Sequence, residues 1–328
     1  MSPRRHHIVS AGYQRYFADG ELIRHWVKAD RTWTPPIGVR DSFVEKGFNS
    51  IRSPDPAGLE HMENEWSQIE RVTLPAIAAL ESGERSMDVA TAVKAIAAIH
   101  FCRSYSFREL SNVFIERERG KAAVMETQPN MIDAFAKDHG RQPRAGEIEA
   151  LYQTTIDRYQ QSNFHFVNSM GRIYGKVMEL LDPLHLQVVV PRTRAIGLLT
   201  SDSPVVIKSK MKIGPLQGVG IERSDLLYLP LSRWMAVCFV VSPLEDHKLA
   251  PSEVQMVNLL MLRNCMERMA AHPDEDIPRA LGLRAPDGWP PPDQSTPGPP
   301  DQRRSDRANP IGLATLPYWS AKSPHEDG

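Results

Sequence analysis

Residues 196–207 read Ile-Gly-Leu-Leu-Thr-Ser-Asp-Ser-Pro-Val-Val-Ile, so a polar break stands between two short apolar runs. Short runs of Val, Ile and Leu that are interrupted by Pro, Asp and Ser are typical of buried β-strands. The pattern predicts a β-rich part over about 186–242, arranged as a mostly antiparallel sheet. The predicted strands lie at 187–191, 195–200, 205–208, 219–222, 226–231 and 235–241.

The part of the chain over about 59–182 has the periodicity of helices. Apolar residues recur three and four positions apart over 59–73 and over 88–103, and a further helix is predicted to begin near Pro129. The longest pattern covers 146–181 with a repeat of 3.5 residues. It predicts one helix of about 50 Å, at about 1.5 Å per residue, and a candidate surface for helix-mediated self-association.

The two ends of the chain differ in kind. Residues 21–28 form an imperfect apolar alternation that predicts a short strand. Ser252, followed three residues later by Gln255, has the spacing of a capping box and predicts a last helix over about 252–271. Residues 284–328 are rich in proline and poor in apolar residues, so we expect a disordered tail.

Together these segments predict a single α+β domain over 1–283. It would have an N-terminal β element, a central helical layer with one long helix, and a C-terminal, mostly antiparallel sheet capped by the last helix. A domain of this size buries roughly three quarters of its unfolded surface, so it needs no disulfide or metal to fold.

Composition narrows the classes of function. The formal net charge is −1 at pH 7, which provides no strong basic field for binding nucleic acids. The three cysteines, Cys102, Cys238 and Cys265, lie in apolar segments without CxxC spacing, as expected of reduced thiols in a cytoplasmic protein. The sequence contains no apolar run of 18 residues, so neither a membrane span nor secretion is expected.

His6 and His7 are the first candidate catalytic residues. A neutral imidazole serves equally as a general base or as a metal ligand, and an apolar stretch begins immediately after the pair. Adjacent side chains of a strand point to opposite faces, so only one of the two would line a given site. The alternative is a flexible N-terminal dipeptide.

Asp202 is the second candidate, since it stands in the polar break between two predicted strands. A carboxylate at a strand end is well placed for catalysis or for sharing a divalent metal with His7. Thr200, Ser201 and Ser203 flank it and are candidates to bind a ligand or cofactor. The alternative is an Asx or Ser turn, in which the carboxylate binds nearby backbone N–H groups.

Arg103 is the third candidate. It continues the apolar face of the helix predicted over 88–103, and a buried guanidinium needs an anionic or carbonyl partner. Asp202 or an anionic ligand would supply that partner. Alternatively the helix has already ended, and Arg103 is a solvated charge at its C-terminus.

Three stretches carry a resemblance to a known family: residues 6–9 (His-His-Ile-Val), residues 13–18 (Tyr-Gln-Arg-Tyr-Phe-Ala) and residues 200–205 (Thr-Ser-Asp-Ser-Pro-Val). They resemble a bacterial domain family of unknown function, number 4238, which is marked by a His-His-Tyr-Val-Pro opening and a Ser-Asp-Asn-Pro centre. Arg103-Ser104 and the run 229–232 also look similar to the family. The resemblance covers about residues 5–269 and implies no accepted activity.

The chain departs from the family pattern at two positions. Ser10 stands where the family has proline, and Ser203 stands where it has asparagine, whereas both histidines and Asp202 match. Ser203 offers a hydroxyl in place of an amide, which puts in doubt any role carried by that position.

Two functions are consistent with these residues. In the first, the protein is a hydrolase, acting for example on a phosphodiester. Histidine would be the base or a metal ligand, Asp202 would orient it, and Arg103 would neutralise the developing anion. In the second, the protein is a non-catalytic binding or regulatory protein, and the His–Asp pair is a structural clasp. Catalysis requires these groups in an open pocket, whereas a clasp requires them buried and satisfied.

Overall fold

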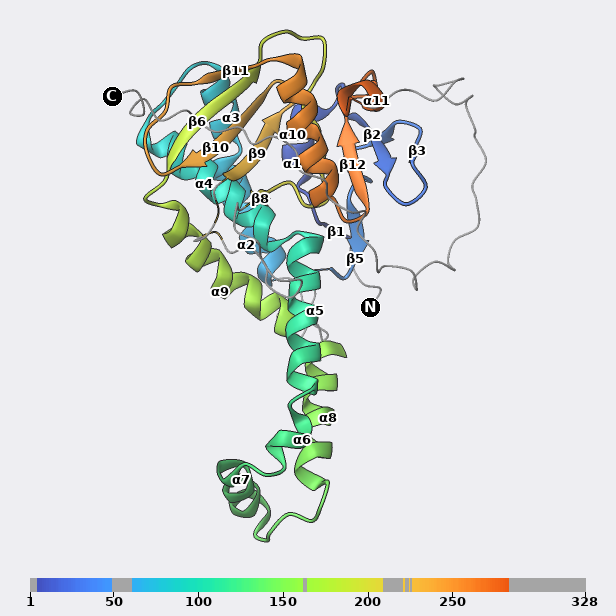
Figure 1. Ribbon diagram of the computed structural model, residues 1–328, viewed down its shortest axis with the longest axis vertical. Coiled ribbons are helices and arrows are strands. Elements are labelled where there is room, and N and C mark those ends of the chain that lie inside the picture. Colours follow the sequence, from blue (N-terminus) through green and yellow to red (C-terminus); the bar gives the residue numbers. More distant parts are fainter. Residues whose placement is uncertain are drawn as a thin grey trace, which may run out of the picture. The chain divides into compact units, whose positions relative to one another are not determined.

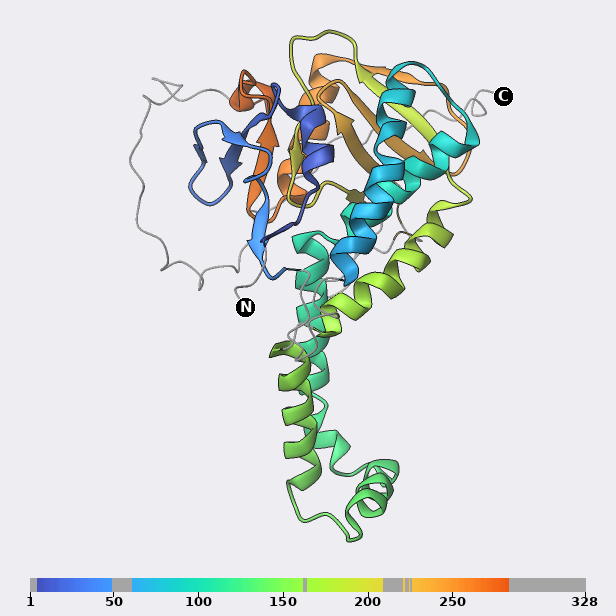
Figure 2. The ribbon, with the colours of Figure 1, turned by 180° about the vertical axis from the view of Figure 1, so that it is seen from behind.

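The computed structural model describes residues 5–48, 61–161, 164–208, 221, 224 and 226–282, all within one compact unit, 1–288. Helices and mostly antiparallel sheets combine in this unit (Figures 1 and 2), which confirms the predicted α+β class. The tail at 284–328 and the strand predicted over 219–222 lie outside the described residues, apart from Ile221. In the described part, no helix is long and apolar enough to cross a membrane.

The described helices are α1 (Ala11–Gln14), α2 (His61–Thr73), α3 (Pro75–Glu81), α4 (Met87–Cys102), α5 (Tyr105–Arg119), α6 (Ala122–Met125), α7 (Pro129–His139), α8 (Glu147–Gln161), α9 (Phe164–Leu181), α10 (Pro251–Asn264) and α11 (Ile277–Ala280). The described strands are β1 (Arg5–His7), β2 (Leu22–Val27), β3 (Thr32–Trp33), β4 (Ile37–Gly38), β5 (Val44–Lys46), β6 (His185–Pro191), β7 (Thr200–Ser201), β8 (Val206–Lys208), β9 (Leu226–Ser232), β10 (Met235–Val240), β11 (His247–Leu249) and β12 (Arg268–Ala271).

The C-terminal sheet has the order β11-β6-β10-β9-β8 and lies between two apolar layers. Only the pair β11–β6 is parallel; the other neighbours are antiparallel. Alternate residues of β10 point to opposite faces, as the pleat requires. Val237 and Phe239 join the core formed with α4 and α9, whereas Ala236 and Cys238 join the core formed with α10.

A second sheet joins the two ends of the described chain in the order β3-β2-β12-β7, with β4 also paired to β2. Met269 of β12 lies opposite Trp26 of β2 on one side and opposite Ser201 of β7 on the other. The predicted helix over 252–271 is therefore wrong in its last part. Helix α10 ends at Asn264, because Cys265 is extended (ψ 132°) and the next residues enter this sheet.

The start of α10 also differs from the prediction. Ala250 is the N-cap residue and Pro251 the first helical residue, so Ser252 lies inside the helix. Glu253 accepts a hydrogen bond from the Ala250 amide at 2.7 Å. The side chain therefore supplies half of a capping box without a Ser or Thr partner.

The single long helix predicted over 146–181 is wrong. Helices α8 and α9 point in different directions (Figure 1), and Asn163 between them lies outside the described residues. Met170 and Val177 of α9 are buried in the core shared with α4. Helix α8 instead pairs with the segment around α5, where Tyr152 donates to Glu118 at 2.9 Å. The continuous apolar pattern of residues 146–181 thus belongs to two helices, of which α9 packs against α4 and α8 pairs with α5.

Candidate functional site

Arg103 follows the last residue of α4 and is almost fully buried, with 2 % of its surface exposed. Its Nη1 donates to Glu70 Oε1 at 2.5 Å, and its Nη2 donates to the backbone carbonyl of His7. Nη2 also lies 3.7 Å from Glu63 Oε1. A buried guanidinium needs such partners, and this chain supplies them for both Nη atoms, whereas Nε has no hydrogen-bond partner among the described residues.

The carboxylate partners of Arg103 come from one face of α2. Glu63 and Glu70 are seven residues apart, which is two helical turns and places them on the same side. Ser10, from the N-terminal motif, donates its hydroxyl to Glu70 Oε2 at 2.8 Å. The second oxygen of Glu70 is therefore occupied by the residue that replaces the family's proline.

His7 lies beside this ion pair. Burial, followed by the Arg103 charge, lowers the pKa of His7 below 6.5, whereas Glu63 and the backbone of Val39 and Arg40 act in the opposite direction. The imidazole is therefore neutral at pH 7. Its Nε2 atom is buried and has no hydrogen-bond partner among the described residues. His7 thus has the protonation state of a base, although a base also needs access to its substrate.

His6 points to the other side of β1. It is 2 % exposed and lies opposite Glu45 of β5 in the antiparallel pair β1–β5. The two histidines therefore have different surroundings, as expected for neighbours on a strand.

Asp202 is fully buried, with 0 % of its surface exposed. Its Oδ1 accepts the N–H of Met266 at 2.9 Å, and its Oδ2 accepts those of Glu267 at 2.6 Å and Arg268 at 2.9 Å. Burial raises the pKa of Asp202 to about 6, although the three N–H donors favour the ionised form. The carboxylate therefore binds the turn between α10 and β12.

The neighbours of Asp202 are also engaged within the chain. The Thr200 hydroxyl is 3.1 Å from the Tyr13 hydroxyl, and the Ser201 hydroxyl donates to the Met261 sulfur at 3.1 Å. The Ser201 oxygen also accepts the Ser203 amide at 3.1 Å. All three motif side chains, Thr200, Ser201 and Ser203, are buried. None of them is presented to solvent for binding a cofactor.

The junction between α4 and α5, residues 103–106, contacts both the N-terminal motif (residues 6–10) and the central motif (residues 200–205). On one side Arg103 binds His7; on the other the Ser106 hydroxyl lies 2.9 Å from the Ser203 hydroxyl. Between them, Tyr105 donates to Glu45 at 2.8 Å, and burial, followed by the Glu45 charge, raises the pKa of the Tyr105 hydroxyl. The two motifs are thus joined through residues 103–106.

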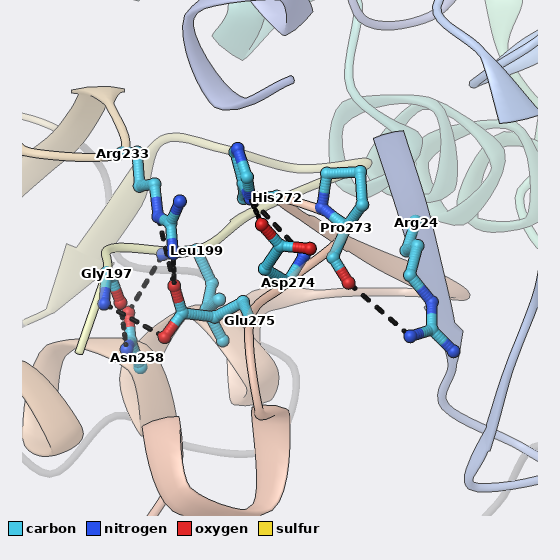
Figure 3. Close-up of polar contacts among 9 residues, drawn as sticks. All are labelled: Arg24, Gly197, Leu199, Arg233, Asn258, His272, Pro273, Asp274 and Glu275. Atoms are coloured by element: carbon cyan, nitrogen blue, oxygen red, sulfur yellow. Dashed lines mark hydrogen bonds and ion pairs between the residues drawn. The ribbon is translucent and has the colours of Figure 1, made fainter. Parts of the chain in front are cut away.

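A second polar network fixes the residues that precede Asp202 (Figure 3). Asn258 of α10 accepts the Leu199 amide and donates to the Gly197 carbonyl, both at 3.0 Å. Glu275 accepts the Gly197 amide at 3.0 Å and pairs with Arg233 at 2.9 Å. A Cβ at position 197 would lie 2.6 Å from the Glu275 carboxylate, so this close approach requires glycine. The network positions the strand that carries the central motif.

The contacts predicted between the candidate residues form only in part. Arg103 reaches His7, through the backbone carbonyl, but its carboxylate partners are Glu63 and Glu70 in place of Asp202. None of the hydrogen bonds and ion pairs of His7 and Arg103 among the described residues involves Asp202, so the predicted contacts of Asp202 with these two residues are wrong; its predicted contact with His6 stays a prediction. A metal shared by His7 and Asp202 does not fit this arrangement. Among the described residues, no group of three His, Cys, Asp or Glu side chains is arranged to hold a metal ion.

Sequence reasoning missed the roles of Glu70, Tyr105 and Ser106. The seven-residue spacing of Glu63 and Glu70 was a usable signal for Glu70, since Arg103 lay on an apolar face and required an acid. Ser104 caps α5 by accepting the Phe107 amide at 3.0 Å, so its side chain marked a new helix immediately after Arg103.

The family model described as "Protein of unknown function (DUF4238)" matches residues 5–275. The chain belongs to the DUF4238 family. No curated protein and no solved structure matches this DUF4238 chain. The family match ends within the described residues, just after β12, and covers both motifs together with the junction that joins them.

Proposed function

We propose that this DUF4238 protein is a non-catalytic binding or regulatory protein, in which the N-terminal motif (residues 6–10) and the central motif (residues 200–205) stabilise the fold. The observation that carries the proposal is the state of Asp202: it is 0 % exposed and both oxygens accept backbone N–H groups. A catalytic carboxylate needs an oxygen that a substrate, a metal or a transferred proton can reach. Asp202 is better suited to holding the turn before β12.

Arg103 supports the same role. Its guanidinium is 2 % exposed and is matched by Glu70 and the His7 carbonyl. A cation that stabilises a substrate anion has to meet that anion, whereas this one is enclosed by its own chain. The two motifs therefore hold the fold together at two separate places: Asp202 binds the turn before β12, and Arg103 joins α2 to β1.

A second candidate function, a hydrolase acting for example on a phosphodiester, is supported by His7. This imidazole is half-buried, its pKa is lowered, and its Nε2 atom has no hydrogen-bond partner among the described residues. In this candidate His7 would be the general base, and its burial together with the nearby Arg103 charge would keep it neutral.

The cysteines support a cytoplasmic location for either function. Cys102, Cys238 and Cys265 are free and buried. Burial raises the pKa of each thiol, to about 12 for Cys238, which keeps all three protonated and unreactive. We propose that the protein works in a reducing compartment.

A nuclease and phosphodiesterase panel, together with metal analysis, separates the two functions. It is run on the wild-type protein and on His7→Ala, Asp202→Ala and, as a matched control, His185→Ala, whose side chain is exposed. The unfolding midpoint of each variant is measured alongside. The non-catalytic proposal expects equal background activity in all four and a loss of stability in Asp202→Ala. An activity that disappears in His7→Ala, but remains in His185→Ala, overturns it in favour of the hydrolase.

A further inference from the structure

Helix α5 has an apolar stripe on its exposed side. Leu110, Val113 and Phe114 are 40 %, 50 % and 49 % exposed, and their spacing of three and one places them on one face. The buried residues Phe107 and Ile115 lie on the adjoining side of the helix, and Phe114 is seven residues from Phe107, so the apolar surface of α5 continues from the core into solvent. Three neighbouring exposed apolar side chains on one helix are typical of an interaction surface.

Charged residues of opposite sign stand at the two ends of this stripe. Glu109 and Arg117 are both exposed, four residues before and four residues after Val113. Each is about 6 Å from Val113 along the helix axis, at about 1.5 Å per residue. Neither forms an ion pair with another residue of the described chain. An acidic or a basic partner would match only one end of the stripe.

A second copy of the same helix matches both ends. We propose that α5 is a self-association surface, on which two copies pack antiparallel about a two-fold axis near Val113. Val113 and Phe114 of the two copies meet at the centre of this arrangement. Glu109 of each copy then lies opposite Arg117 of the other, so that one surface forms two opposite-charge pairs. A surface that complements itself in this way is the requirement of a two-fold dimer.

This surface is distinct from the one expected from sequence. The apolar residues Met170 and Val177 in the 146–181 pattern are buried against α4 within the chain. Helix α5 is 15 residues long, about 22 Å at about 1.5 Å per residue, so the interface is small. We therefore expect a dimer that forms with rising protein concentration and dissociates on dilution.

The test is sedimentation velocity or light scattering of the full chain over a wide concentration range. We expect the wild-type mass to rise from 36.9 kDa toward twice that value. Val113→Glu should keep it at the monomer value, because it introduces like charges at the two-fold axis. Val241→Glu is the matched control: Val241 is 82 % exposed and lies outside α5, so this variant should dimerise as the wild type does.

Charge reversal tests the orientation. Glu109→Arg and Arg117→Glu each place like charges opposite one another twice, and each should weaken the dimer about tenfold. The double variant E109R/R117E exchanges the two signs and should recover most of the wild-type affinity. Circular dichroism checks the fold of every variant. A wild-type protein that stays at 36.9 kDa at all concentrations overturns the proposal, as does a Val113→Glu dimer or a double variant no better than the singles.

Discussion

Asp202 and Arg103 are both buried charges of the motif network, but they are held in different ways. Asp202 binds three backbone N–H groups of a single turn. Arg103 binds side chains of α2 and the backbone of β1, and its partners Glu63 and Glu70 keep 26 % and 17 % exposure. One charge is satisfied by backbone N–H groups and the other mainly by carboxylates that are partly exposed. Changes in sequence and in pH should therefore affect them differently.

The largest effect is expected from Asp202→Ala. Three backbone N–H groups lose a charged acceptor, and a hydrogen bond to a charged group contributes about 1.5–3 kcal/mol, so unfolding should become easier by about 4 kcal/mol. Urea denaturation measures the change. Asp30→Ala is the control, since Asp30 is exposed and its removal should alter stability by less than about 0.5 kcal/mol. Similar values for the two variants would show that Asp202 does not hold the turn.

Arg103→Ala should cost somewhat less, about 3 kcal/mol, because Glu70 is partly solvated and its uncompensated charge can still reach water. The double variant R103A/E70A should be less destabilised than the sum of the two single variants, since the charge left unpaired by one change is removed by the other. Denaturation of the three variants gives this comparison. Additive losses would mean that the two side chains are not coupled.

The two regions should respond to acid in opposite directions. The pKa of Asp202 is raised to about 6 in the folded state, so the folded form binds the proton more tightly. Between pH 7.5 and 5, stability relative to Asp202→Asn should therefore rise by about 1 kcal/mol.

The pKa of His7 is lowered in the folded state, so the contribution of His7 to stability is present above pH 6.5 and is lost as the pH falls. Relative to His7→Gln, the wild type should lose stability over the same range. Urea titrations at each pH check both signs; equal slopes for both pairs would contradict them.

The smallest effect concerns the link between the two regions. Ser106 and Ser203 share a hydroxyl contact of 2.9 Å, and the Ser106 amide also donates to the Ser203 hydroxyl at 3.3 Å. Ser106→Ala and Ser203→Ala should each cost about 1 kcal/mol, with a coupling of about 0.5 kcal/mol in the double variant. A coupling of zero in this double-mutant cycle would leave the two motifs energetically independent.

The sequence was a good guide where local patterns decide the structure. Strands β9 and β10 were predicted within a residue or two, since their apolar runs are bounded by turn residues. The last helix was extended too far because Val254, Met261, Cys265 and Met269 keep a helical spacing. What ends that helix is a carboxylate 64 residues away, Asp202, which binds the amide of Met266. No local pattern contains that contact.

The site residues show the same limit. The sequence left two alternatives for Arg103, a buried guanidinium or a solvated charge beyond the helix end; α4 does end before Arg103, but the side chain is buried. The partner of Arg103 could not be predicted from the sequence, because Asp202 and Glu70 are both carboxylates. Only the path of the folded chain brings Glu70 beside Arg103. The partners of Asp202 are backbone groups, which every residue carries. Side-chain chemistry therefore singled out residues that the fold buries, but it did not predict the residues that they contact.

Strand β12 has a consequence for the order of events during synthesis. Residues of β2 pair with β12, so that Val27 lies opposite Arg268. Since ribosomes add about 5–20 residues per second, β2 emerges tens of seconds at most before its neighbour, about 240 residues later in the chain. Strand β2 therefore lacks this neighbour while the central helices and the C-terminal sheet are synthesised. A chain truncated before β12 cannot complete its second sheet. Only a chain that has been synthesised through β12 can therefore pair β2 with its partner strand.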